Sequence, residues 1–410
     1  MPFFLAGDEG RPPVVVRMVA KQVLVAALGL SALGCASTIP LDRGVLAYDR
    51  ATAAIISREL LLNIARARQN LPMHFTAISN ITATYKLSFS GGITPTLTGD
   101  RGFLVVPFLG AGREESPTVS IVPMQGEEFT QRLLTPFREE RVTMLLEQGY
   151  DVDALLRLMA AEIRIAKGGN WQDVDICANR PSDRDGYTSF RRVMAHLSSI
   201  QDRHALRVEP LVLRYTWTLP ASSVAPDTFQ SLSRDFSLAY DPKSATYEVS
   251  KRITGRVIVA NYDPATLPEA ERLRLNDEAE LGPFNEILVD IRPGFPGGEY
   301  PVHGQLRLRS FHEVLAFLGR GIEEEPEYDV PPDPRTRTIS ENPVHTLEVV
   351  EVHRPLPSTD LSVALGSRYY ALGPQKGYQW NRKAFSLLYQ LFQMTVSAPA
   401  QAGPAITISK

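Results

Sequence analysis

The chain has 410 residues, of which 44% are hydrophobic and 22% are charged, as is typical of globular proteins. Its formal net charge of −3 argues against a nucleic-acid-binding protein, which needs a basic face to replace the counterions of phosphates. The length is sufficient for one large domain or for two ordinary ones with cores of their own.

The first 34 residues predict a cleaved signal peptide. Lys21 supplies positive charge ahead of Val23–Gly34, a segment of apolar or small residues interrupted only by Ser31. As a helix this segment would extend about 18 Å, too short for a hydrocarbon core of ~30 Å, so cleavage is favoured over membrane spanning. The acidic residues further upstream do not fit a signal, and we expect translation to begin at Met18.

The junction Ala32-Leu33-Gly34-Cys35 resembles the lipobox of bacterial lipoproteins. In such proteins the cysteine is diacylated, becomes the new N-terminus and receives a further acyl chain such as palmitate. The resemblance implies lipidation at Cys35, and residues 35–44 would then form a short lipidated tether. The residue after the cysteine is Ala36 rather than aspartate, which resembles lipoproteins sorted to the outer membrane. An ordinary signal with an incidental cysteine is the alternative.

Residues 45–205 predict a helix-rich region with one β-hairpin. Apolar residues recur at steps of three and four over 45–68, which predicts a helix. Arg66 and Arg68 at its end either interact with the helix dipole while exposed to solvent or form a clamp for an anionic ligand. Residues 77–90 alternate apolar and polar side chains, which predicts a strand ended by a Gly-Gly turn.

A further helix is predicted over 153–166, with Asp151 near its N-cap, followed by a polar loop over 168–186. Four carboxylates in this loop could bind calcium, but their spacing is not that of an EF-hand, and loops are often rich in aspartate. We therefore expect no metal site there. The four residues are Asp173, Asp175, Asp183 and Asp185.

Cys177 is the remaining cysteine once Cys35 carries lipid. It is either a nucleophile or, as is commoner for a free cysteine, a small buried hydrophobic residue. No neighbouring cysteine or histidine has the spacing of a zinc site.

Residues 206–410 predict an antiparallel sheet with packed helices, which together with the helix-rich N-terminal half gives an α+β fold class. The acidic, proline-rich segment 323–343 predicts a mobile surface loop. Tyr369, Tyr370 and Trp380 form either an aromatic ligand platform or, as we favour, part of the core between sheet and helix.

Several segments look like parts of a family of functionally uncharacterised proteobacterial lipoproteins of the outer-membrane type. This resemblance touches about a third of the chain and implies a structural scaffold without an assigned activity. The segments are LLLNIARARQNLPMHF, ITATYKLSF, FTQRLLTPF, LLEQGYDVDALLRL, LRLRSFHEVLAFLGRGIE, VALGSRYYALG and FSLLYQLFQ.

The sequence contains no metalloprotease, Walker or nucleophile-elbow motif, and we expect no cofactor. Our first hypothesis is a lipid-anchored, periplasm-facing protein of the outer membrane, a non-enzymatic scaffold or accessory subunit that binds another envelope component and no nucleic acid. The alternative is a periplasmic hydrolase that acts on cell-wall or glycan material with two carboxylates. A carrier of lipid or another apolar ligand is a third possibility, which requires a cavity enclosed by the sheet.

Overall fold

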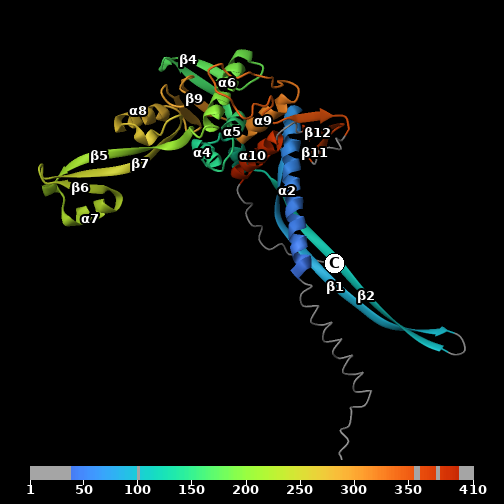
Figure 1. Cartoon of the computed structure of the whole chain (residues 1–410). Coiled ribbons are helices and arrows are strands. Elements are labelled where there is room, and N and C mark those ends of the chain that lie inside the picture. Colours follow the sequence, from blue (N-terminus) through green and yellow to red (C-terminus); the bar gives the residue numbers. More distant parts are fainter. Residues whose placement is uncertain (1–37, 99–101, 355–360, 375–378, 397–410) are drawn as a thin grey trace, which may run out of the picture. The chain divides into compact units, whose positions relative to one another are not determined.

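A computed structural model describes residues 38–98, 102–354, 361–374 and 379–396, and its fold class is α+β as predicted (Figure 1). Cys35 and the predicted signal peptide lie outside the described residues. Within the described residues, no helix has the length and apolar character needed to cross a bilayer.

The chain divides into two compact units, one of residues 1–57 and 78–121, the other of 58–77 and 122–410. The predicted boundary at 205/206 does not coincide with this division. Helix α2 (Thr38–Arg68), which belongs to the first unit up to Ser57 and to the second from Arg58, begins earlier than predicted, within the expected tether. Strands β1 (Phe75–Thr98) and β2 (Gly102–Met124) pair as a two-stranded sheet. The Gly-Gly pair expected to end β1 lies inside the strand.

The second unit is built on a seven-stranded sheet with the order β4-β3-β9-β8-β7-β5, to which β6 adds beside β7. Strands β7 and β8 are parallel, and the other paired strands are antiparallel. The strands are β3 (Ala160–Lys167), β4 (Asn170–Ala178), β5 (Arg207–Pro220), β6 (Ser237–Asp241), β7 (Thr246–Ala260), β8 (Glu286–Ile291) and β9 (Val302–Leu308).

Helices surround this sheet, and a second, three-stranded sheet has the order β10-β12-β11. The helices are α3 (Glu127–Leu134), α4 (Glu139–Glu147), α5 (Val152–Met159), α6 (Arg184–Gln201), α7 (Pro226–Asp235), α8 (Glu269–Glu280), α9 (Phe311–Gly321) and α10 (Trp380–Thr395), with short 3-10 turns at Ala221–Ser223 and Pro264–Thr266. The strands of the small sheet are β10 (Val349–Val352), β11 (Ser362–Leu365) and β12 (Arg368–Leu372).

Two predicted elements of the second unit differ from the structure. The helix expected over 153–166 ends at Met159, and the chain continues directly as β3. The expected polar loop at 168–186 contains β4 and the start of α6. The cause is pairing, because β3 lies between β4 and β9 and hydrogen-bonds to both, which outweighs the helical preference of an alanine-rich sequence.

Segment 323–343, expected to be a mobile surface loop, lies against the core over part of its length. Glu325, Glu327 and Val330 are buried. Glu327 binds side chains of α5 and α6, so specific polar contacts hold this irregular chain in place.

Strands β5 and β7 extend well beyond the rest of the sheet. They pair from Arg207↔Ala260 to Pro220↔Thr246, whereas β8 reaches only Ile258–Ala260 of β7. The outer parts, residues 212–220 and 246–254, therefore form a projecting ribbon with β6 and α7 at its end (Figure 1). We call residues 212–254 the ribbon.

Candidate functional site

The ribbon has two chemically different faces, which follow from strand alternation and register. Side chains of directly paired residues lie on the same face of an antiparallel sheet. One face is apolar and aromatic, and we call it the aromatic face. Its paired residues are Leu213↔Ile253, Tyr215↔Lys251, Trp217↔Val249, Leu219↔Tyr247, Leu238↔Val249 and Tyr240↔Tyr247.

The large side chains of the aromatic face contact one another but remain accessible to solvent. The rings of Tyr215 and Trp217 are stacked, with centroids 6.4 Å apart and an interplanar angle of 21°. Phe236 approaches Trp217 edge-on at 5.9 Å, and Tyr240 lies 5.2 Å from Tyr247. The exposed fractions are 37% for Tyr215, 46% for Trp217, 41% for Ile253, 53% for Tyr240 and 40% for Phe229 of α7.

Such a group of exposed aromatic residues is uncommon on a protein surface without a function. Protein surfaces expose single apolar residues routinely, whereas contiguous apolar patches mark interaction sites. Tyrosine and tryptophan are enriched at interfaces because each buries a large area at little entropic cost and keeps a polar group for hydrogen bonding. The aromatic face therefore has the composition of a protein-binding surface.

A cleft of about 650 Å³ is the second candidate site. It lies between the end of α9 with its following loop, the last turn of α2 and the small sheet. Apolar side chains such as Phe317 and Leu347 line it together with four glutamates, namely Glu323, Glu327, Glu348 and Glu351.

Most of the cleft carboxylates already have arginine partners. Arg68 forms an ion pair with Glu323, and its Nε lies 3.9 Å from a carboxylate oxygen of Glu351. Arg368 lies 3.5 Å from the other oxygen of Glu351. An arginine partner favours the ionised carboxylate, whereas a glycosidase general acid must hold a proton near neutral pH.

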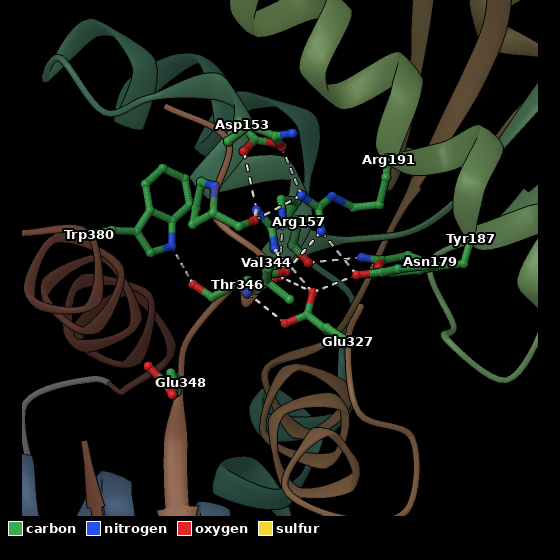
Figure 2. A network of polar contacts seen from close by, with 12 residues as sticks. Asp153, Arg157, Asn179, Tyr187, Arg191, Glu327, Val344, Thr346, Glu348 and Trp380 are labelled. Carbon is green, nitrogen blue, oxygen red and sulfur yellow. Dashed lines mark hydrogen bonds and ion pairs between the residues drawn. The ribbon is translucent and has the colours of Figure 1, made fainter. Parts of the chain in front are cut away.

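Glu327 belongs to a buried polar network behind the cleft (Figure 2). It accepts hydrogen bonds from Arg157 at 3.2 Å, Tyr187 at 2.8 Å, the Thr346 backbone at 2.6 Å and the Thr346 hydroxyl at 2.7 Å. Burial alone would raise the pKa of Glu327, but the charges of Arg157 and Arg191 and the bonds from Thr346 outweigh it and lower the pKa. Glu327 is thus a structural anion.

A histidine between two carboxylates forms a third cluster. Nδ1 of His303 lies 3.0 Å from Asp290, and Nε2 lies 2.5 Å from Glu278. Hydrogen bonds to Asp290 and then to Glu278 raise the pKa of His303 to about 9. Tyr262 donates to Asp290 and Trp171 to Glu278, so a protonated imidazole is held in a closed ion cluster. This arrangement stabilises the cation and leaves no ring nitrogen available as a base.

The structure does not gather the four aspartates of the predicted polar loop. Asp173 and Asp175 both pair with Lys167, at 3.4 and 2.7 Å. Asp183 caps α6 by accepting from the Gly186 backbone, and Asp185 lies in the first turn of the same helix. Within the described residues, no group of three potential ligands could hold a metal ion.

Other residues singled out in the sequence have structural contacts. Cys177 is buried, as expected of a small hydrophobic residue, and burial raises its pKa to about 11, which disfavours the nucleophilic thiolate. Tyr370 and Trp380 are buried, which confirms their prediction as core residues, whereas Tyr369 of the same predicted group is half-buried. Arg66 donates to the His74 carbonyl, while Arg68 lines the cleft.

Sequence reasoning did not identify the aromatic face as a site. The strands were predicted, and the alternation of Leu213, Tyr215 and Trp217 with polar residues was visible in the sequence. What the alternation could not show is where the core stops covering this face. Leu213 belongs to the same buried cluster as Leu275 of α8, whereas Tyr215 and Trp217 are exposed.

Comparison of the chain with protein-family models, with curated proteins and with solved structures finds no match. Function is therefore inferred from the side chains and their geometry.

Proposed function

We propose that the chain is a lipid-anchored protein of the bacterial outer membrane that acts as a scaffold or accessory subunit. It binds another envelope protein through the aromatic face of the ribbon. The observation that carries this proposal is the group of exposed aromatic side chains on an element that projects from the sheet, with Trp217 near its centre.

The anchor in this proposal comes from the sequence around Cys35. Its direct test is incorporation of labelled palmitate, which we expect in the natural chain and not in Cys35→Ser. A natural chain that takes up no label would remove the membrane part of the proposal and leave the binding surface to be tested separately.

The hydrolase alternative has less support. The cleft contains several carboxylates, but Arg157 lowers the pKa of Glu327, and Glu351 is already paired with Arg368. The carrier alternative also lacks support, because the large sheet is open, with β4 and β5 at its edges among the described residues.

The binding surface is tested by mild crosslinking in cells followed by purification of the full-length chain. We expect the natural chain to recover a discrete envelope protein and Trp217→Ser to lose most of it. Leu281→Ser is the matched control, because Leu281 is an apolar residue that is 84% exposed outside the ribbon. Equal recovery by Trp217→Ser and the natural chain would contradict the proposed site.

A further inference from the structure

The outer edge of β5 is free. β5 is the last strand in the sheet order, and its only strand partner among the described residues is β7. Within the ribbon, Val212 and Arg214–Thr218 of this strand are exposed. Backbone N–H and C=O groups on such an edge can pair with an added strand, and many proteins bind extended peptides in this way.

The face opposite the aromatic face carries an arginine pair without a counter-charge. Arg214 and Arg252 are directly opposite each other in the register of β5 and β7, and both are exposed. Neither side chain forms an ion pair or hydrogen bond with another described residue. Like charges placed directly opposite across two strands destabilise the pairing. An anionic partner would remove this cost.

Towards the end of the ribbon, the residues of β5 and β7 on this face are polar. Thr216 pairs with Ser250, and Thr218 pairs with Glu248, which is acidic. In the other direction the face continues with Val212 and Thr254, and Thr254 lines a pocket with Glu140 and Glu147 of α4. The hydroxyl groups can donate to an anion, whereas β5 itself contains no acidic residue between Pro210 and Pro220.

We propose that the partner contributes an extended segment of alternating apolar and acidic residues, which pairs with the outer edge of β5. This inference rests on the proposed function and specifies the partner's chemistry. Because side chains of an added strand alternate between the two faces, its apolar residues would extend the aromatic face beside Tyr215 and Trp217. Its acidic residues would lie on the face of Arg214 and Arg252, where guanidinium groups bind carboxylates strongly.

A second copy of this chain is a poorer occupant. Pairing of two β5 edges would bring one Arg214 towards the other and supply no carboxylate, since neither edge contains one between Pro210 and Pro220. We therefore expect that the purified chain does not dimerise through this edge. A dimer detected by light scattering and abolished by Arg214→Glu would overturn the proposal.

The test uses the purified full-length chain and a fluorescein-labelled, nine-residue peptide that alternates valine and glutamate. Fluorescence anisotropy is expected to show saturable binding that weakens at least tenfold in Arg214→Glu and in Arg252→Glu. Arg207→Glu is the matched control, an exposed arginine of the same strand outside the ribbon, and should bind as the natural chain does. A matching peptide of valine and lysine should bind only the two ribbon variants.

Backbone pairing is tested with two further peptides that carry N-methyl groups on alternate amides, one on the odd and one on the even positions. Only one edge of an added strand faces β5, so one methylation pattern should abolish binding and the other should be tolerated. Equal tolerance of both patterns would overturn strand addition, and absence of binding to the unmodified peptide would overturn the whole inference. If the unmodified peptide does not bind but Trp217→Ser still loses the cellular partner, the proposed function stands, and only an added strand of alternating apolar and acidic residues is excluded.

Discussion

Glu327 and Arg157 place opposite charges in the interior of the second unit, with side-chain exposures of 5% and 0%. Removing one partner of a buried ion pair leaves the other charge without compensation, which typically costs 3–5 kcal/mol. We therefore expect Glu327→Ala to lower the free energy of unfolding in urea by about 3–5 kcal/mol.

The control for Glu327→Ala is Glu128→Ala, which breaks an exposed i,i+4 pair with Arg132 on α3. Such surface pairs contribute about 0.2–1 kcal/mol. Similar losses in the two variants would show that the buried network does not hold the segment after α9 in place.

His303 predicts a pH dependence of stability with a defined sign. Its folded pKa of about 9 exceeds the unfolded value of 6.5, so protonation stabilises the folded chain. This contribution is fully present below pH 6.5 and is lost as the pH rises through 9. The difference in unfolding free energy between the natural chain and His303→Gln should shrink by an amount on the order of 3 kcal/mol between pH 6 and pH 10. If the difference in unfolding free energy between the two chains did not change with pH, His303 would not be held as a protonated imidazole in the folded chain.

The ribbon should be less stable than the sheet from which it projects. Residues of β8 are buried along the whole strand, whereas most of β5 beyond Leu213 is exposed. The free energy of local opening is small where few buried contacts are lost. Hydrogen exchange followed by mass spectrometry should show faster exchange over 214–220 than over β8 and β9, and the valine-glutamate peptide should slow it. If residues 214–220 exchanged as slowly as β8 in the absence of peptide, the ribbon would be as stable as the main sheet, which would contradict this prediction.

The sequence predicted the bounds of an element well where the signals lie within that element's own residues. Helix α2 ends at Arg68 as expected, because apolar periodicity and stop signals are local. The strand at 160–167 was missed, because its conformation depends on pairing with β9, some 140 residues further along the chain. The burial of Glu327 was missed for the same reason, since its partners lie on α5 and α6.

In the proposed function, the N-terminal lipid anchor inferred from the sequence holds a folded unit whose ribbon projects from the main sheet. The α+β class was predictable from the order of helical and strand patterns. The division into compact units was not, because β3 and β4 join strands that follow residue 206 in one sheet.

The proposed function requires that the aromatic face contacts another protein in the cell. A photoreactive benzophenone amino acid placed at Tyr215, at Trp217 or, as the exposed control, at Leu281 captures such a contact when living cells are irradiated. We predict a discrete crosslinked protein from both ribbon positions and none from Leu281. No adduct at either ribbon position, with the chain present at its normal level, would contradict the claim.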